Sequence, residues 1–277
     1  MVKGILCSSG ALITRYNGRD PRLLRSIWGG LQADGLEFMI YPSWDGRLDE
    51  VEETVCRIKR DLMIGIPVVH ADKRIGELLS LGSDEELQEA RVRFIRGLRI
   101  AERLNSSLMV LHLWGGPASD RHIERNYSVL ADYRAEAEKR GVLLTVENVV
   151  CAVGSPLSHL MELMDREPEA RFTVDTKMAE FHGELDATVA CERLWNGAAA
   201  HLHVNDYGGG IKDFSDLRVL HIGEGHVDFE PFFDRVRASG YSGYATVEST
   251  SVRPDGSIDF DRINRSLQRV REALKAK

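Results

Sequence analysis

Acidic and histidine side chains follow four apolar segments of the sequence, where together they could bind a metal ion. Glu147, Asp175 and Glu248 come directly after LLTV, RFTV and YATV. His203 ends a fourth segment, AAHLH. Apolar, β-branched runs of this length predict buried strands. A carboxylate at the end of a buried strand is costly unless it is paired with a cation or bound to a metal ion.

Three converging carboxylates would repel one another, and a divalent cation is the simplest way to keep all three ionised. Carboxylates with one imidazole and no thiolate suit Mn²⁺, Mg²⁺, Co²⁺ or Zn²⁺. The spacing is regular, because 28 residues separate Glu147 from Asp175 and 28 more separate Asp175 from His203. We therefore predict one divalent metal ion bound by these three residues and Glu248. His201 lies deeper on the same strand face as His203 and is expected to be structural.

Other side chains near the predicted strand ends could contact a substrate. They are two histidines, a tryptophan and two cations: His70, His112, Trp114, Lys177 and Arg218. An indole ring could form an apolar wall on which a sugar ring stacks. Each residue also has a structural interpretation, as a hydrogen-bonded histidine, a buried tryptophan or a solvated cation, and both interpretations stay open at this stage.

The elements that must position these residues alternate along the whole chain. Apolar segments such as VKGILCSS are each followed by an amphipathic pattern such as RLDEVEETVCRIKRDLM. This pattern occurs eight times and predicts a parallel sheet buried on both faces. In 277 residues, eight units favour a single α/β domain, residues 1–277, folded as a closed (β/α)8 TIM barrel. An open doubly wound sheet is the second choice, because no GxGxxG motif follows the first segment.

Composition narrows the class of protein further. The 43% of hydrophobic residues suffices for a large core, and no run of 18 uncharged apolar residues predicts a membrane span. A net charge of −7 argues against tight binding to nucleic acid. Four cysteines lie far apart without a CxxC pair, as in a reduced protein. We expect a cytoplasmic protein that is able to form a homo-oligomer.

The ordered set of motifs resembles a known family, the xylose isomerase-like TIM barrels. TVEN, TVDT, HLHVND and IGEGHVDFEPFFDRVRASGYSGYATVES carry the resemblance, which covers nearly the whole chain. This superfamily includes sugar (phosphate) isomerases and epimerases, inosose dehydratases and endonuclease IV. The resemblance implies a divalent-metal-dependent (for example manganese) isomerase or epimerase of a sugar, sugar acid or polyol, so that its partner is a small carbohydrate-like molecule. It also implies that Glu147 and Glu248 remove and return a proton beside a carbonyl.

The sequence departs from the family pattern at two positions. The isomerases and epimerases commonly carry a histidine three residues after the aspartate that matches Asp175, and here that residue is Met178. The ketose 3-epimerases carry a second glutamate where this chain has Val153. His182 could take the place of the absent histidine if the chain folds back. These departures keep a metal-dependent dehydratase of a keto-polyol, such as an inosose, as the alternative function.

Two other classes of protein are weighed against an enzyme of sugar metabolism. Endonuclease IV also has histidines at the positions of His70 and His112. Its three-metal cluster needs further ligands, however, and this chain has Met178 and the segment 217–219 (Leu-Arg-Val) in their places. A non-catalytic binding subunit on the same fold is the remaining class, because a fold alone does not fix a function.

Overall fold

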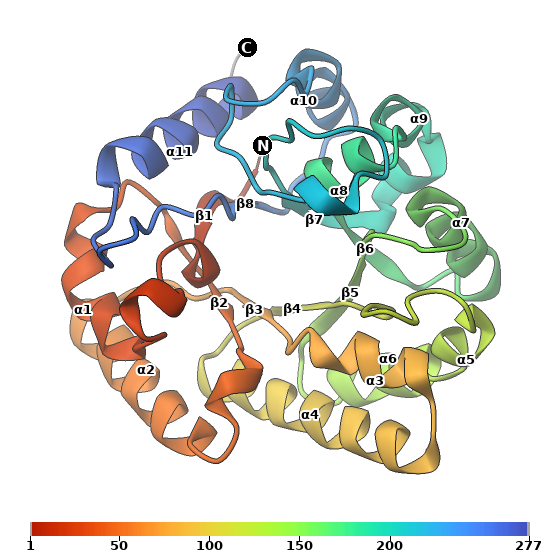
Figure 1. Ribbon diagram of the computed structural model, residues 1–277, viewed down its shortest axis with the longest axis horizontal. Helices are drawn as coiled ribbons and strands as arrows, with labels where there is room; N and C mark the ends of the chain where they lie inside the picture. The colour runs from red at the N-terminus through yellow and green to blue at the C-terminus, as the bar shows by residue number, and fades with distance from the viewer. Residues whose placement is uncertain (1, 276–277) are drawn as a thin grey trace.

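Eight parallel strands form a closed barrel at the centre of the protein, in the order in which they occur along the chain (Figure 1). The computed structural model describes residues 2–275, and within it the last strand pairs with the first. The predicted (β/α)8 fold is therefore confirmed. The strands are β1 (Gly4–Ser8), β2 (Gly35–Met39), β3 (Val68–His70), β4 (Leu108–Leu111), β5 (Leu143–Glu147), β6 (Arg171–Asp175), β7 (Ala199–His203) and β8 (Tyr244–Val247).

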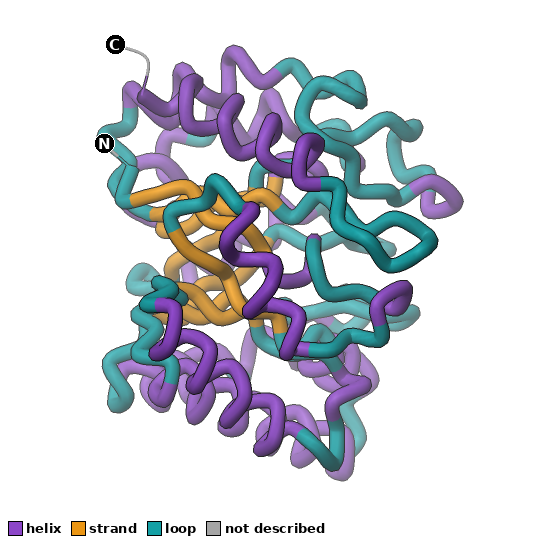
Figure 2. Tube along the Cα trace, turned by 90° about the vertical axis from the view of Figure 1, so that its left-hand side faces the viewer, coloured by secondary structure: helices purple, strands orange, loops and turns teal. Residues whose placement is uncertain are grey.

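Helices surround the strands on the outside, as the side view in Figure 2 shows. They are α1 (Leu24–Ile27), α2 (Leu48–Leu62), α3 (Arg74–Leu81), α4 (Asp84–Arg103), α5 (Ile123–Ser128), α6 (Leu130–Glu138), α7 (Pro156–Arg166), α8 (Thr176–Phe181), α9 (Leu185–Ala190), α10 (Phe229–Ala238) and α11 (Phe260–Lys275). Single turns, labelled η, lie between them: η1 (Ser9–Ala11), η2 (Arg15–Asn17), η3 (Pro21–Leu23), η4 (Trp28–Gly30), η5 (Pro42–Trp44), η6 (Leu194–Ala198) and η7 (Phe214–Asp216). No helix within residues 2–275 has the length and apolar character needed to cross a membrane.

The connection from β1 to β2 differs most from the sequence-based expectation. The pattern DPRLLRSIWGGLQADG predicts one helix over residues 20–35, but the chain there forms η3, α1 and η4. Gly29 and Gly30 weaken a helix at its end. Gly30 also lies against the ring of Phe260, which a Cβ at that position would approach to 2.6 Å. Packing against α11 therefore favours short turns over a continuous helix.

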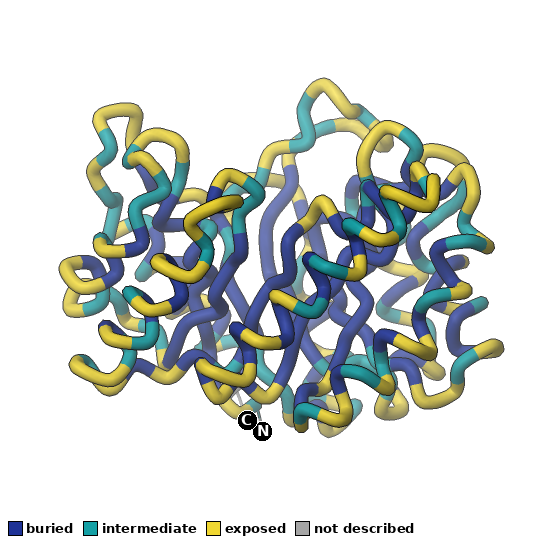
Figure 3. Tube along the Cα trace, turned by 90° about the horizontal axis from the view of Figure 1, so that it is seen from below, coloured by how far each residue is buried: buried dark blue, intermediate teal, exposed yellow. Residues whose placement is uncertain are grey.

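The interior of the barrel changes from apolar to polar along its axis. A small apolar cluster of Leu6, Val68, Leu108 and Val110 includes the first residues of β3 and β4. Polar residues lie closer to the carboxyl ends of the strands, as for the Thr145 hydroxyl, which lies 2.7 Å from that of Thr173. Figure 3 shows the buried strands at the centre and exposed residues concentrated in the loops and on the outer faces of the helices. The strands therefore carry buried polar groups towards one open end of the barrel.

The strand ends agree with the sequence-based assignment at most positions. β3, β5, β6 and β7 end on the predicted polar residues, namely His70, Glu147, Asp175 and His203. His112 and Glu248 each follow directly after a strand. The apolar run LEFMIYP predicts a second strand that ends near Trp44 and Asp45. β2 instead ends at Met39, because the chain turns at Pro42 into η5 and buries the Trp44 ring.

Gly76 of α3 provides a test of how closely this helix packs against the chain that follows β4. A Cβ there would come within 2.6 Å of the backbone oxygens of both His112 and Trp114. Because backbone atoms cannot move aside as a side chain can, we expect Gly76→Ala to lower the free energy of unfolding by about 1–3 kcal/mol. Urea denaturation measures this change.

Gly97→Ala is the matched control. A Cβ at Gly97 in α4 would meet only side chains, those of Met109 at 3.3 Å and Ile40 at 3.7 Å. Alanine also favours a helix over glycine by about 1 kcal/mol. This variant should therefore be as stable as the wild type or more stable. An equal loss in both variants would show that the close approach at Gly76 is not the cause.

Candidate metal centre

The four predicted ligands lie together at the open end of the barrel. One donor atom from each of Glu147, Asp175, His203 and Glu248 lies within 4.8 Å of the others. Nδ1 of His203 lies 3.3 Å from Oε1 of Glu147 and 3.3 Å from Oε2 of Glu248. The same nitrogen lies 3.9 Å from Oδ2 of Asp175. The parallel strands therefore bring residues that are distant in sequence to a common point.

Two asparagines fix the carboxylates of this group. The side chain of Asn148 bonds the backbone of Asp175 twice, accepting its N–H at 2.6 Å and donating to its carbonyl at 3.0 Å. Asn205 accepts the N–H of Glu248 at 2.9 Å and donates to the carboxylates of both Asp175 and Glu248, at 3.3 and 3.4 Å. Oδ1 of Asp175 also accepts the N–H of Met178, at the start of α8. One oxygen of Asp175 is thus held by the backbone while the other faces the group.

The charges in this group call for a cation. Burial by itself lowers the pKa of His203, but the carboxylates of Glu248, Glu37 and Glu147 outweigh it and raise that pKa well above its ordinary value. Burial raises the pKa of Asp175 to about 6, and Glu147 and Glu248 add to the shift. Oε1 of Glu248 is buried and has no hydrogen-bond partner among the described residues. Three carboxylates and an imidazole lack enough positive charge to balance them, and this set of ligands suits a hard or borderline divalent cation.

His70 and His112 form a second group that shares Glu147 with the first. Their Nε2 atoms lie 3.2 and 2.8 Å from Oε2 of Glu147. Nδ1 of His70 lies 2.8 Å from the carbonyl oxygen of Ala71, a contact that places a proton on Nδ1. Nε2 of a neutral His70 is then a lone pair facing a carboxylate, an arrangement that a cation between them would relieve. Burial lowers the pKa of His112 to about 4, so its ring is neutral.

A pocket of about 490 Å³ lies next to the metal centre and is the place where a substrate could enter. His112 lines it, and so does Met178, which stands where the family commonly has a histidine. Arg19, Lys73 and Arg74 give its wall three positive charges, whereas Glu77 gives it one negative charge. His112, which contacts Glu147, therefore lies in the wall of a pocket that is mainly positively charged.

The structure does not bring all predicted substrate-binding residues to this pocket. Trp114 is fully buried, and its indole N–H donates to the carbonyl of Val149 at 3.3 Å, so it does not present a face to a sugar. Arg218 lies in an exposed loop, 69% of its side chain is accessible, and it pairs with Asp216. Trp114 is thus a buried packing residue and Arg218 a solvated cation, because the path of each loop decides where the side chain points.

Lys177 differs from these two residues, because it is buried beside the candidate ligands. It is only 5% exposed, and its charge is close enough to Asp175 to oppose the rise in the pKa of that carboxyl. No hydrogen bond or ion pair of its ammonium is found among residues 2–275, yet Nζ is not one of the fully buried unpaired atoms. The ammonium therefore keeps some access to solvent beside the candidate ligands.

His182 and Cys151 belong to another polar cluster, outside the metal centre. Nε2 of His182 accepts the backbone N–H of Cys151 at 3.0 Å, so the histidine does not replace the one absent at Met178. Burial raises the pKa of the Cys151 thiol far above its ordinary value, which leaves no thiolate to act as a nucleophile. We assign both residues to the support of the loop after β5.

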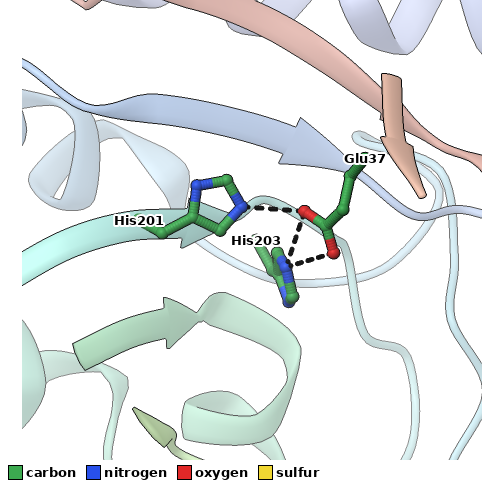
Figure 4. A group of neighbouring side chains, drawn as sticks. All are labelled: Glu37, His201 and His203. Carbon is green, nitrogen blue, oxygen red and sulfur yellow. Dashed lines mark hydrogen bonds and ion pairs between the residues drawn. The ribbon is translucent and has the colours of Figure 1, made fainter. Parts of the chain in front are cut away.

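Glu37 of β2 is the buried residue that the sequence analysis missed. It is fully buried, and its carboxylate faces one ring nitrogen of His201 and one of His203, as Figure 4 shows. Oε2 of Glu37 is 2.8 Å from Nε2 of His201, and Oε1 is 3.1 Å from Nε2 of His203. The hydroxyl of Thr246 donates to Oε2 at 2.7 Å. The only sequence signal was an acidic residue inside the apolar segment LEFMIY.

Comparison with known proteins identifies the family. A family model described as "Xylose isomerase-like TIM barrel" matches residues 30–275. The chain therefore belongs to the xylose isomerase-like TIM barrel family, as its motifs and its fold indicated. A protein of Methanocaldococcus jannaschii that is named only as uncharacterised is 23% identical over 220 residues, which are 76% of this chain and 73% of that protein.

Solved structures agree on the fold. A D-tagatose 3-epimerase-like protein is 19% identical and superposes with a TM-score of 0.73, covering 98% of this chain and 97% of its own. D-allulose 3-epimerase from Methylomonas sp., in complex with D-allulose, is 14% identical with a TM-score of 0.72 and coverages of 98% and 96%. A 3-keto-D-glucoside 4-epimerase from E. coli is 16% identical with a TM-score of 0.66 and coverages of 98% and 99%. At these identities the likeness establishes the fold alone.

Asp120 supports the loop that follows Glu147, and its contribution should depend on pH. Its carboxylate accepts three backbone N–H groups at 2.5–2.9 Å, from Ala152, Val153 and Gly154. It also lies 3.0 Å from Nε2 of His159. Burial opposes its ionisation, but these hydrogen bonds outweigh burial and hold the pKa of Asp120 below its ordinary value.

We expect Asp120→Asn to lower the free energy of unfolding at pH 7 by about 1–3 kcal/mol, because an amide has one acceptor oxygen instead of two. A carboxyl with a depressed pKa stabilises the fold above its unfolded pKa of about 4. This stabilisation is lost as the pH falls through the folded-state pKa. Urea denaturation at pH 7, 5 and 3 should therefore show a difference between wild type and variant that shrinks at pH 3. Asp132→Asn, on the exposed side of α6, is the control, and a difference at Asp120 that is independent of pH would contradict the assignment.

Proposed function

We propose that the protein is a divalent-metal-dependent isomerase or epimerase that moves a proton at the carbon beside a carbonyl in a sugar, sugar acid or polyol. One observation carries the proposal. Glu147, Asp175, His203 and Glu248 converge at the open end of the barrel, beside a pocket of about 490 Å³. Active sites of TIM barrels lie at this end. The epimerases among the solved structures of the same fold support this choice of reaction.

Glu147 and Glu248 are the proposed acid and base. They extend from the ends of β5 and β8, on different sides of the barrel, so they can address opposite faces of a substrate between them. A bound divalent cation would offset the negative charge that develops on the substrate oxygens. Glu248 is the better placed to accept the proton, because Oε1 has no partner in the described structure and the side chain is 11% exposed. Glu147 would return the proton from the other face.

Lys177 and the basic pocket residues are the proposed contacts of the substrate. The buried ammonium of Lys177 can donate to a substrate oxygen, and so stabilise charge at a carbonyl that loses a proton beside it. His112, at the pocket wall, can orient a hydroxyl. Arg19, Lys73 and Arg74 favour a substrate that carries a carboxylate or a phosphate besides its hydroxyls.

Dehydration of a keto-polyol is the second candidate function. It begins with the same removal of a proton beside a carbonyl, after which a hydroxyl leaves from the neighbouring carbon. Met178 favours keeping this candidate, because the residue removes an imidazole that the family's isomerases and epimerases commonly have near the substrate. Loss of water gives an enone or dione that absorbs ultraviolet light, whereas epimerisation leaves the chromophore unchanged.

Metal content tests the centre directly. Protein purified without chelator should contain about one Mn, Co, Zn or Mg per chain by mass spectrometry. His203→Ala should lose most of it, because the variant lacks the only imidazole among the four proposed ligands. The matched control is His226→Ala, whose ring is 52% exposed and pairs with Glu180. Two or three zinc ions per chain would favour the endonuclease branch, and a folded protein that binds none even after supplementation would leave a non-catalytic binding subunit.

Proton exchange in D₂O tests the chemistry. Over a panel of ketoses, sugar acids and their phosphates, the metal-loaded protein should incorporate deuterium beside a carbonyl in at least one compound. We expect Lys177→Met to reduce the rate for that compound by tenfold or more while the metal content stays at the wild-type level. A Lys139→Met variant, at an exposed residue just after α6 and outside the pocket, is the comparison for loss of charge alone. An unchanged rate in Lys177→Met would exclude the lysine from the reaction.

A further inference from the structure

Glu37 joins two histidines across the interior of the barrel, and only one of them is a candidate metal ligand. β2 provides Glu37, whereas β7 provides His201 and His203. All three residues have no exposed side-chain area. In Figure 4 the carboxylate faces one nitrogen of each ring, with one dashed line to His201 and two to His203. Glu37 thus contacts Nε2 of His203, whereas the other carboxylates lie near Nδ1.

The two ring nitrogens of His203 have different partners. Nε2 lies 3.1 and 3.2 Å from the two oxygens of Glu37. Nδ1 lies 3.3 Å from the carboxylates of Glu147 and Glu248. A neutral imidazole has one N–H and one lone pair. A proton on Nε2 donates to Glu37 and leaves the lone pair of Nδ1 directed at the group of candidate ligands, which is the arrangement that a metal ion requires.

The other bonds to Glu37 keep its carboxylate from turning away. Nε2 of His201 and the hydroxyl of Thr246 both contact Oε2, at 2.8 and 2.7 Å. Three groups therefore share two acceptor oxygens, and each group comes from β7 or β8. A ligand histidine whose second nitrogen is bonded to a fixed carboxylate is held in one tautomer and is a stronger donor to the metal.

We infer that Glu37 is a positioning residue for the metal centre: it fixes the Nε2–H tautomer and the ring orientation of His203, and thereby sets the affinity for a divalent cation. The inference rests on the proposed function, because it takes His203 as a metal ligand. An oxygen of Glu37 also lies within 4.8 Å of donor atoms of His70 and Glu248, but its hydrogen bonds to the four proposed ligands are those to Nε2 of His203. Its effect on the centre is therefore expected to pass through His203. His201 serves the same purpose one step further away, by holding Glu37.

Binding of Co²⁺ to the full-length protein, stripped of metal by chelator, tests the inference. Glu37→Gln keeps the size of the side chain but replaces one acceptor oxygen by an amide NH₂. We expect the dissociation constant for Co²⁺, followed by its visible absorption, to rise by about 10- to 100-fold. The absorption bands should also shift, because the ligand geometry at His203 changes.

Thr246→Val is the matched control, because it removes one hydrogen bond to Glu37 without removing an acceptor of His203. Both variants should lose thermal stability, whereas only Glu37→Gln should lose Co²⁺ affinity by tenfold or more. Glu37→Gln that folds and binds Co²⁺ with wild-type affinity and spectrum overturns the inference and leaves the proposed function standing. Failure of the folded wild type to bind Co²⁺ overturns the proposed function, and the inference with it.

Glu37→Gln could fail to fold, and a measurement on the wild type then decides. Long-range ¹H–¹⁵N correlation spectra of the Zn²⁺-loaded protein report which ring nitrogen of each histidine carries the proton. A proton on Nε2 of His203 supports the inference. A proton on Nδ1 of His203 overturns it, because that nitrogen would then be unable to bind the metal.

Discussion

The repulsion between carboxylates buried at one point is the constraint on which the rest of this structure depends. Glu147, Asp175 and Glu248 converge on the imidazole of His203 at the end of the barrel, where burial leaves little water to screen their charge. The surrounding hydrogen bonds hold the carboxylates in place without neutralising them, because Asn148 and Asn205 are neutral. The pKa shifts of His203 and Asp175 express the same demand for positive charge. A divalent cation satisfies that demand, and the tautomer of His203 decides how well.

The closed barrel allows residues of several strands to contact the buried carboxylates and His203. Closure of the barrel pairs β8 with β1, so only β1 separates β2 from β8, and Glu37 of β2 reaches Thr246 of β8 and His201 of β7. In an open sheet of the same strand order, β2 would lie near one edge and β8 at the other. The amino-terminal part of the interior is apolar, so the polar residues are stacked towards the open end. The apolar core thus occupies the amino-terminal end of the barrel, and the candidate metal centre occupies the carboxyl end.

Sequence periodicity predicts the fold and most of the centre for a simple reason. His70, Glu147 and His203 each end an apolar segment, and in parallel strands such ends meet at one rim. Glu37 could not be assigned in this way, because it lies inside its strand and its histidine partners are 164 and 166 residues away. The positions of Trp114 and Arg218 were equally beyond prediction, since the path of a loop decides whether a side chain is buried or solvated.

Met178, next to the buried Lys177, stands where the family commonly has a histidine, and this difference limits which side chains can transfer a proton. An imidazole near pH 7 can both donate and accept a proton, whereas an ammonium can only donate and a thioether does neither. The pocket wall that includes Met178 therefore contributes shape rather than proton transfer. In the proposed reaction, proton removal and return then fall to Glu147 and Glu248 alone. Lys177 is left to hold the oxygen on which charge develops, a role that needs a fixed positive charge and no exchange of its proton.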